Sequence, residues 1–449
     1  MNKQSYEQKK EALLKEFKNK KGKGIISINK NTSNLFRSRQ KIKKQRINVR
    51  NFNEVIFIDK ENLTAEVEGM TTFETLVNET LKYNLLPPVV PQLKMITLGG
   101  AISGIGIEAS SFKYGLVHET VLEMEVLLGN GKIITCTPKN KYKDLFFNLP
   151  NSYGTLGYIL KVKIKLIKAR KFVEINHLKY NNQKEYFKDI SNLCKKDYDF
   201  IDGTVFNENE MYITLGKFID SAPYAGNYKY MNIYYKSIRK NKVDYLTTKD
   251  FIWRWDPDWF WTSRLFLMQN FIPRLLFGKF MLNSNAYIAI RRLNDKYNLT
   301  QKFSLIKNFF KKTKKSEAVV QDVGIPIENC VQFFDFFNKE IKIKPFWICP
   351  TKSYNKNTFP LFDIDTEKLY IDFGFWDFVQ SDKPTGYYNK KIELIVEKLK
   401  GKKSLYSESF YREKEFWRIY NGNIYKKLKA KYDPNHVFLN LYEKCVKRA

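Results

Sequence analysis

The chain has 449 residues, of which 43% are hydrophobic and 28% charged, and its formal net charge is +31. The length predicts two domains, and the hydrophobic content excludes a disordered chain. The charge leaves three interpretations open: a lysine-rich composition without functional meaning, attraction to anionic lipid headgroups, and sequence-independent binding of nucleic acid. Lysines are spread along the whole chain and no zinc-finger or RNP-like spacing occurs, so we expect no specific nucleic-acid partner.

The cysteines are odd in number and scattered, which argues against a disulfide framework and against a zinc or other metal site. They are Cys136, Cys194, Cys330, Cys349 and Cys445. The N-terminus lacks the apolar run of a signal peptide, and no stretch reaches the roughly 18 apolar residues of a membrane span. We therefore expect a cytoplasmic protein that at most lies on a membrane surface.

The N-terminal region is strongly basic. Residues 1–23 predict a basic helix, and residues 25–28 a short strand. Residues 37–50 then carry seven Lys or Arg and no acid. Such a run is typical of a solvated loop, and the alternative is contact with an anion, either a cofactor phosphate or an anionic membrane.

The next 120 residues alternate between strands and short helices. Residues 55–59 and 63–69 predict strands, and Thr71 is the expected N-cap of a helix that ends at Leu81. Gly129-Asn130-Gly131 between two apolar runs predicts a β-hairpin over residues 121–137. A further strand is expected over residues 156–167.

From residue 171 the composition changes. This part holds all seven tryptophans and mixes strands, such as residues 368–373, with helices, such as residues 392–400. It predicts a second α+β domain, in which large aromatic side chains either line a slot for an apolar substrate or form ordinary core.

The most informative stretch is rich in glycine and small residues and runs from Thr97 to Glu108. Glycine lets the backbone approach a ligand closely, and successive N–H groups can form a concavity suited to a pyrophosphate. The G-x-G-x-x-G spacing of a Rossmann fold is absent. On composition alone, a tight structural turn is the competing interpretation.

Several separate blocks along the chain resemble the vanillyl-alcohol-oxidase-type (PCMH-type) FAD-binding fold. These blocks are Thr97–Gly100, Ser111–Gly115, Val121–Leu128 with Gly129-Asn130-Gly131, Asp144-Leu145-Phe146, Gly154–Gly157, and Tyr432–Asn435 with Asn440. Within that superfamily the chain resembles the Δ24-sterol reductase (diminuto/seladin-like) family. Residues that carry this likeness include Gly106–Ser111, Lys113–Leu116, Val320-Gln321-Asp322, Trp255–Trp261, Phe346–Pro350, Tyr370-Ile371-Asp372 and Glu415-Phe416-Trp417.

The resemblance implies an α+β, two-domain FAD-linked oxidase fold. The basic helix would occupy residues 1–24, the FAD-binding domain residues 25–170 and the substrate domain residues 171–425, and residues 426–449 would return to the FAD domain.

The resemblance also implies where FAD binds. The backbone of the glycine segment would hold the phosphates, and Ser110, Ser111 and the turn Gly154–Gly157 would continue the cleft. The residues expected to contact FAD are Thr97, Leu98, Gly99, Gly100, Ser103, Gly104, Ile105, Gly106, Glu108, Ser110, Ser111, Gly154, Thr155, Gly157 and Asn440. We expect the flavin to be noncovalent, because the only histidines are His118, His177 and His436, and the glycine segment contains neither His nor Cys.

The implied reaction is reduction of a C=C bond in a lipid, with NADPH as electron donor. A sterol and an unsaturated or methylene-branched fatty acyl chain both suit as substrate. The sequence does not separate four candidates for the proton donor: Glu408, Tyr406, Tyr411 and Asp372. Two other functions stay open, namely an FAD oxidase or dehydrogenase of an alcohol or hydroxy acid, and a non-catalytic module that binds lipid or nucleic acid.

Overall fold

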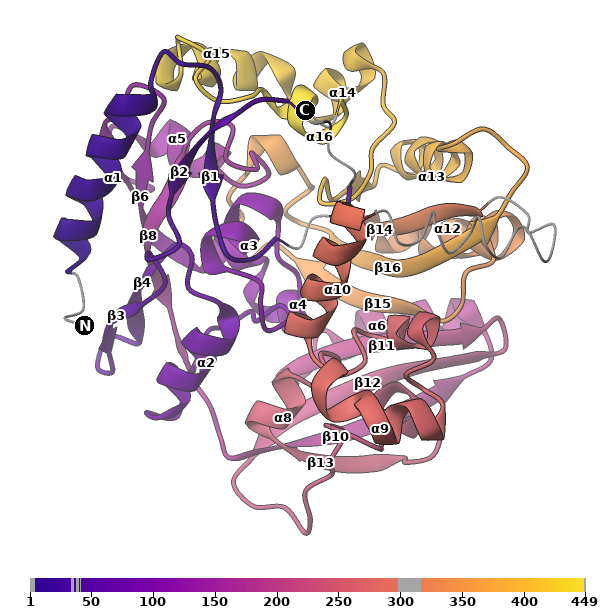
Figure 1. Cartoon of the computed structure of the whole chain (residues 1–449). Coiled ribbons are helices and arrows are strands. Elements are labelled where there is room, and N and C mark those ends of the chain that lie inside the picture. Colours follow the sequence, from indigo (N-terminus) through magenta and orange to yellow (C-terminus); the bar gives the residue numbers. More distant parts are fainter. Residues whose placement is uncertain (1–4, 34–35, 38–39, 41, 298–315, 448–449) are drawn as a thin grey trace.

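The computed structural model describes residues 5–33, 36–37, 40, 42–297 and 316–447. Two antiparallel sheets of five and eight strands dominate the molecule, and the smaller sheet comes from the N-terminal third of the chain (Figure 1). The mixed α+β architecture expected from the sequence is confirmed.

The N-terminal helix α1 (Tyr6–Lys20) is part of the packed fold. A capping box at Ser5 begins it, and its apolar side packs against β1 (Ile26–Asn29) and the parallel strand β2 (Gln45–Asn48). Lys9 is buried and its Nζ lies 2.9 Å from the Glu68 carboxylate. The expected basic helix and first strand are therefore confirmed. One lysine of the helix, Lys9, does not face solvent but forms a buried ion pair.

The five-stranded sheet has the order β3-β4-β8-β6-β7. Its strands are β3 (Val55–Asp59), β4 (Thr64–Glu68), β8 (Tyr158–Lys165), β6 (Val121–Leu127) and β7 (Ile133–Cys136). The hairpin predicted at Gly129-Asn130-Gly131 joins β6 to β7. Helix α2 (Phe73–Leu81) ends where expected but is capped by Thr72, because it is Thr72 Oγ1 that accepts the N–H of Thr75. The Thr71 hydroxyl instead donates to the Glu54 carbonyl.

Short elements connect this sheet to its surroundings. They are β5 (Leu85–Leu86), β9 (Ile167–Lys168), α3 (Leu98–Gly104), α4 (Ser111–Tyr114), η1 (Val117–Thr120) and α5 (Lys143–Asn148). The main core fills the space around them and continues toward the second sheet, so the two sheets share one hydrophobic interior.

The eight-stranded sheet has the order β13-β10-β12-β11-β15-β16-β14-β17. Its strands are β10 (Phe172–Tyr180), β11 (Phe200–Asn207), β12 (Glu210–Ile219), β13 (Val243–Thr247), β14 (Ser316–Pro326), β15 (Phe346–Lys352), β16 (Leu369–Gln380) and β17 (Lys402–Lys403). One face is apolar, with residues such as Ile348, Phe373 and Val323. Helices α6 (Gln183–Leu193), α12 (Cys330–Phe336) and α13 (Tyr387–Lys398) cover that face.

Helices between β12 and β14 form a group at the front of the molecule in Figure 1. They are α7 (Tyr234–Ser237), α8 (Thr248–Ile252), η2 (Thr262–Phe266), α9 (Phe271–Met281) and α10 (Ser284–Tyr297). The remaining short helices η3 (Ile327–Asn329), η4 (Phe337–Ile341) and η5 (Pro360–Phe362) follow β14 and β15.

The C-terminal helices lie over the first sheet's side of the molecule (Figure 1). They are α14 (Glu413–Ile419), α15 (Gly422–Tyr432) and α16 (Leu441–Cys445). Lys429 on α15 donates to the Thr155 carbonyl at 2.8 Å, and Lys431 pairs with Asp144 at 2.7 Å. These contacts tie the end of the chain to segments that precede residue 170.

Candidate functional site

The glycine segment forms a short helix, α3, and not an open turn. Thr97 caps it by accepting the Gly100 N–H, and Ile105 ends it in the left-handed conformation with φ 61°. The N–H groups of Leu98 and Gly99 already donate to the carbonyls of Thr71 and Gly69, between β4 and α2, at 2.9 Å each. The first turn is therefore satisfied internally, which differs from the open concavity that the glycine content predicts.

One face of α3 carries almost no side chains. Gly100, Ser103 and Gly104 lie one turn apart, and all three are partly exposed. Ser103 Oγ donates back to the Gly99 carbonyl at 2.7 Å. A Cβ added at Gly100 would meet only the Thr97 side chain within 4 Å. A Cβ at Gly104 would lie 3.3 Å from the Tyr153 ring, so the backbone open to close approach by a ligand is that of Gly100 and Ser103. The small residues at these two positions fit the phosphate region of FAD.

The end of the glycine segment is fixed by local hydrogen bonds. Gly106 accepts the Val117 N–H through its carbonyl, Ser111 Oγ accepts the Glu108 N–H at 3.1 Å, and Ser110 Oγ donates to a carbonyl at 2.7 Å. These hydroxyl groups hold the loop in shape, so a cofactor contact at these positions would come from the backbone.

The turn Gly154–Gly157 and Asn440, which are expected to contact FAD, are also tied into the fold. Gly154 has φ 75°, which favours glycine, and Gly157 packs against β6. Thr155 Oγ1 hydrogen-bonds the Tyr425 hydroxyl at 2.9 Å, and Asn440 caps α16. The structure brings Thr155 and Asn440 to the same C-terminal junction.

Arg37, the first residue of the basic run, is buried beside the glycine segment. Its Nη1 donates to the Leu405 carbonyl, and its guanidinium lies 5.1 Å from the centre of the Tyr153 ring. Tyr153 in turn donates its N–H to the Ser103 carbonyl at 3.0 Å. Arg37 thus contacts Tyr153, and Tyr153 contacts α3. A buried cation so close to the glycine segment agrees with the interpretation that the basic run contacts a cofactor phosphate.

Glu108 ends the glycine segment inside the protein, against the second sheet. Gln92 donates to its carboxylate, and Arg254 Nη2 lies 3.7 Å from it. The same Arg254 nitrogen pairs with Asp202 of β11 at 2.7 Å, and Trp347 Nε1 donates to Asp202 at 3.1 Å. Burial raises the pKa of Glu108 to about 8, despite the nearby guanidinium.

Two further carboxylates meet on the second sheet because of its strand register. Asp322 of β14 lies opposite Gly374 of β16, and Asp372 is two residues from Gly374, so both side chains point to the same face. That face is opposite to the helix-covered one. Burial raises the pKa of Asp322 to about 7, and burial together with the Asp322 charge raises that of Asp372 well above its usual value. Among the described residues, neither oxygen of Asp372 has a hydrogen-bond partner.

Tyr406 lies beside this pair of carboxylates. Its hydroxyl hydrogen-bonds the Asp322 carboxylate and accepts the Trp376 Nε1–H at 2.9 Å. Burial and the two carboxylates raise the pKa of Tyr406 well above its usual value, so the phenol stays protonated at every physiological pH.

Cys349 of β15 connects the two groups of acids. It pairs with Asp372 in the sheet, and burial raises its pKa, with further increases from the charges of Glu108, Asp372, Asp202 and Asp322. We name these four carboxylates the acidic cluster. The cluster lies where the end of the glycine segment meets the face of the second sheet opposite to helices α6, α12 and α13.

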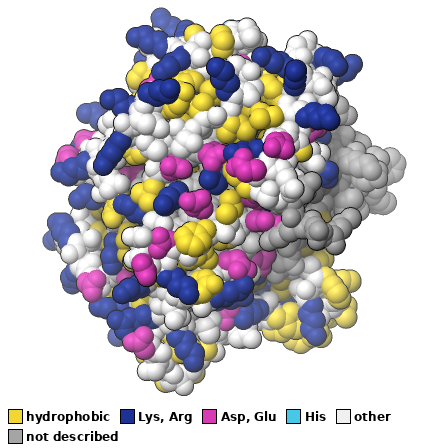
Figure 2. Space-filling model, turned by 90° about the vertical axis from the view of Figure 1, so that its left-hand side faces the viewer, with side chains coloured by type: hydrophobic (Ala, Val, Ile, Leu, Met, Phe, Trp, Pro, Cys, Tyr) yellow, Lys and Arg dark blue, Asp and Glu magenta, His cyan; other side chains and the backbone are white. Residues whose placement is uncertain are grey.

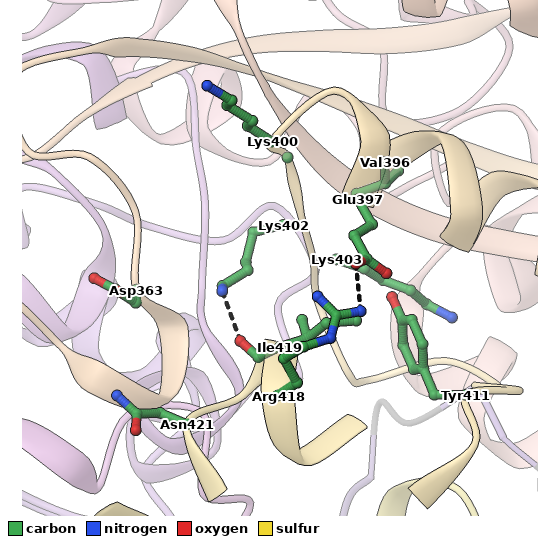
Figure 3. Close-up of a pocket in the computed structure, with 11 residues that line it drawn as sticks. Asp363, Val396, Glu397, Lys400, Lys402, Lys403, Tyr411, Arg418, Ile419 and Asn421 are labelled. Carbon is green, nitrogen blue, oxygen red and sulfur yellow. Dashed lines mark hydrogen bonds and ion pairs between the residues drawn. The ribbon is translucent and has the colours of Figure 1, made fainter. Parts of the chain in front are cut away.

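The two other proton-donor candidates lie elsewhere. Tyr411 lines a cavity of about 430 Å³ beside α13 and α14, whose walls carry Lys402 and Lys403 (Figure 3). The Glu408 carbonyl accepts a hydrogen bond from Lys403 Nζ, which also pairs with buried Glu393. The structure therefore brings Tyr406 and Asp372 together and separates them from Glu408 and Tyr411.

Large aromatic rings pack beside the acidic cluster. Phe260 lies 4.3 Å from Trp376 and 5.8 Å from Trp347 between ring centroids, and Trp255 stacks on Phe260 at 5.1 Å. Among the described residues, the indole nitrogens of Trp255 and Trp261 have no hydrogen-bond partner. The wall next to the carboxylates is thus mainly aromatic, with two indole N–H groups that have no partner among the described residues.

Two charged residues of this site could not be identified as functional from the sequence. Asp322 stands out in the sequence only as part of a family-like block, and Arg254 only as a charged residue before the tryptophan-rich stretch. Their importance follows from a strand register and a long-range ion pair, and neither is visible in local sequence.

The described residues hold no group of three His, Cys, Asp or Glu arranged to bind a metal ion. Within the same part of the chain, every helix is too short or too polar to cross a membrane.

Comparison with known proteins gives two independent findings. Residues 11–137, which include the glycine segment and the first hairpin, match the FAD binding domain family. Over nearly the whole chain, the protein is similar to Delta(24)-sterol reductases. The Arabidopsis thaliana enzyme is 26% identical over 443 residues, covering 88% of this chain and 75% of that protein. The Homo sapiens enzyme is 26% identical over 434 residues, covering 89% and 77%.

A third relative matches about a third of the chain. Cytokinin dehydrogenase 1 of Arabidopsis thaliana is 30% identical over 143 residues, covering 31% of this chain and 25% of that protein. The likeness to sterol reductases covers nearly nine-tenths of the chain and thus extends through both sheets. Residues 11–137 thus resemble an FAD binding domain, and most of the chain is similar to Delta(24)-sterol reductases.

Proposed function

We propose that this protein is an FAD-dependent reductase of a C=C bond in a lipid, with NADPH as the electron donor. The observation that carries the proposal is the Asp322–Asp372 pair beside Tyr406 and an aromatic wall: Asp372 is 1% exposed, and Asp322 and Tyr406 are half-buried. Reduction of an isolated double bond needs a proton donor in apolar surroundings, and this pair provides one.

FAD would be held by the open face of α3, with Arg37 and Tyr153 beside it. When bound, FAD supplies hydride-transfer chemistry. The protein's part is to orient the lipid against the cofactor and to exclude water. The aromatic wall formed by Phe260, Trp347 and Trp376 serves both purposes, since it offers apolar surface and no free acceptor.

The carboxyl pair would hold and deliver the proton. Two carboxyls close together in an apolar interior do not both ionise readily, so the pair keeps a proton near neutral pH. Tyr406 fixes the Asp322 carboxylate through its hydrogen bond, and Trp376 fixes Tyr406. The Asp372 oxygens, free of hydrogen bonds to the described residues, are the ones able to face a substrate.

The substrate class follows from the same wall. A flat sterol or an extended unsaturated or methylene-branched acyl chain suits an aromatic slot, and the names of the relatives favour a sterol side chain.

The test is an anaerobic one. The flavin is reduced with NADPH, and a Δ24-sterol or an unsaturated or methylene-branched acyl lipid is then added. We expect the flavin to be reoxidised and the saturated lipid to appear. Inert lipids together with rapid reoxidation by O2 and turnover of a simple alcohol would instead identify an oxidase.

A further inference from the structure

Half of the exposed large hydrophobic side chains in the described chain lie within 16 residues. Of eighteen such residues, nine belong to η2, its C-cap and α9. We name these nine the apolar lobe: Leu265, Phe266, Leu267, Phe271, Ile272, Leu275, Leu276, Phe277 and Phe280. Figure 2 shows hydrophobic side chains gathered on the projecting part at the lower right, the side on which α9 lies. Soluble proteins rarely expose so continuous an apolar surface unless it binds something.

The apolar lobe is held outward by a buried arginine. Arg274 on the inner side of α9 pairs with both oxygens of Asp258, at 2.7 and 3.0 Å, and donates to the carbonyls of Met268 and Asn232 at 3.1 and 3.2 Å. One turn later, a Cβ at Gly278 would lie 2.9 Å from the Tyr230 ring, so α9 sits close against that ring. These contacts fix which face of the helix is exposed.

Charge identifies the occupant of this surface. Residues 265–281 contain Arg274 and exposed Lys279 but no Asp or Glu. A second copy of a chain that carries a net charge of +31 would be repelled, whereas an anionic bilayer would be attracted. An 11-residue helix is about 16 Å long, too short to span the hydrocarbon region but suited to lie in the headgroup layer.

A series of aromatic rings leads inward from the apolar lobe. Phe266 lies 5.6 Å from Trp259, Trp259 lies 4.9 Å from Tyr287, Tyr287 lies 5.8 Å from Phe36, and Phe36 lies 5.7 Å from Tyr406, all between ring centroids. Tyr406 is the phenol that bonds the carboxyl pair. The surface and the proposed site are therefore joined by contiguous apolar rings.

We propose that the apolar lobe inserts into the surface of an anionic lipid bilayer, and that the ring series is the path by which a lipid reaches the acidic cluster. The docking stands on the exposed residues and charge alone, and only the path rests on the proposed function.

Flotation of the full-length flavin-loaded protein with vesicles tests the docking. Vesicles of phosphatidylcholine with about a quarter phosphatidylglycerol are compared with pure phosphatidylcholine. The lobe variant is Leu276→Ser/Phe277→Ser/Phe280→Ser, whose side chains are 61%, 53% and 77% exposed. The matched control is Leu394→Ser/Phe57→Ser/Phe378→Ser, at 66%, 58% and 53% exposed.

We expect the wild type and the control variant to float with the anionic vesicles and the lobe variant to bind at least ten-fold more weakly. Equal binding by the lobe variant overturns the proposal, and so does equal loss in the control. Light scattering that shows a dimer in the wild type and a monomer in the lobe variant, without vesicle binding, assigns the surface to a second copy and also overturns it.

Turnover separates this proposal from the proposed function. The lobe variant should turn over detergent-dispersed lipid at the wild-type rate and bilayer-embedded lipid at least ten-fold more slowly. If the lobe variant turns over detergent-dispersed and bilayer-embedded lipid at equal rates, the ring series is not the path by which lipid reaches the acidic cluster. Normal vesicle binding with every lipid inert would refute the proposed function and leave the docking in place.

Discussion

At the scale of single residues, the site depends on carboxyl groups whose protonation is set by burial. Asp322 and Asp372 are far apart in sequence and meet only because β14 and β16 pair with the register Asp322–Gly374. A Cβ at Gly374 would lie 2.7 Å from the Asp322 carboxylate and 2.6 Å from the Trp376 ring, so only glycine leaves room for both. The two carboxyl groups can therefore meet because of the strand register and because Gly374 has no side chain.

The raised pKa values predict a pH-dependent stability. The folded chain binds more protons than the unfolded chain between an unfolded pKa of about 3.9 and the folded values, so stability falls as pH rises through this range toward 7. Asp372→Asn removes one ionising group. We expect it to be more stable than the wild type at pH 8 by about 1–3 kcal/mol, with the gap closing toward pH 4. Urea unfolding at several pH values measures this, and an equal gap from exposed Asp382→Asn would contradict it.

The Arg254 ion pairs predict a large stability effect. Arg254 is buried between Asp202 and Glu108, so Arg254→Met leaves two buried carboxylates without their cation. We expect a loss of about 3–5 kcal/mol in the free energy of unfolding. Arg239→Met is the matched control, because Arg239 is 48% exposed in its pair with Glu210 and should cost about 0–1 kcal/mol. Equal effects of the two variants in denaturant unfolding would show that Arg254 does not balance the buried charges.

At the scale of elements, local signals identify some features and long-range pairing others. The 121–137 hairpin was predictable because its Gly-Asn-Gly turn determines the chain reversal locally. The helix α3 was not, because two adjacent glycines oppose helix formation and the Thr97 cap and the contacts to Gly69 and Thr71 override that preference. The meeting of Asp372 with Asp322 needs a strand register that no local pattern encodes.

The open face of α3 gives a prediction for the cofactor. Gly100→Val places a branched side chain on the face that we assign to the FAD phosphates, and it also meets the Thr97 hydroxyl. We expect purified protein to lose its flavin absorption while the second sheet stays folded by circular dichroism. Full flavin occupancy in this variant would place the phosphate site elsewhere.

The mode of flavin attachment follows from where the histidines lie. His118 and His177 are both buried, and burial lowers the pKa of each to about 3. Neither belongs to α3 or to the turn at Gly154. We expect acid or heat denaturation to release all the yellow colour into the supernatant. Flavin that remains with the precipitated chain would contradict this.

At the scale of the whole molecule, two separate parts of the chain contribute residues to one site. The N-terminal part contributes the α3 face, Arg37 and Glu108, and the second sheet contributes Asp202, Asp322 and Asp372. The sequence resemblance predicts this division of labour, and the similarity to sterol reductases through both sheets supports it. What the resemblance could not give is the proton donor, because four candidates share the same C-terminal stretch of chain until folding separates Tyr406 and Asp372 from Glu408 and Tyr411.

The most direct test of the account compares the wild type with the double variant Asp322→Asn/Asp372→Asn under anaerobic conditions. Both proteins are reduced with NADPH and mixed with an unsaturated lipid, and the return of oxidised-flavin absorption is followed. The account predicts reoxidation by the lipid in the wild type and a rate lower by roughly 10²–10⁴-fold in the double variant, with unchanged flavin content. Equal rates in the two proteins, or reoxidation by O2 alone, would contradict it.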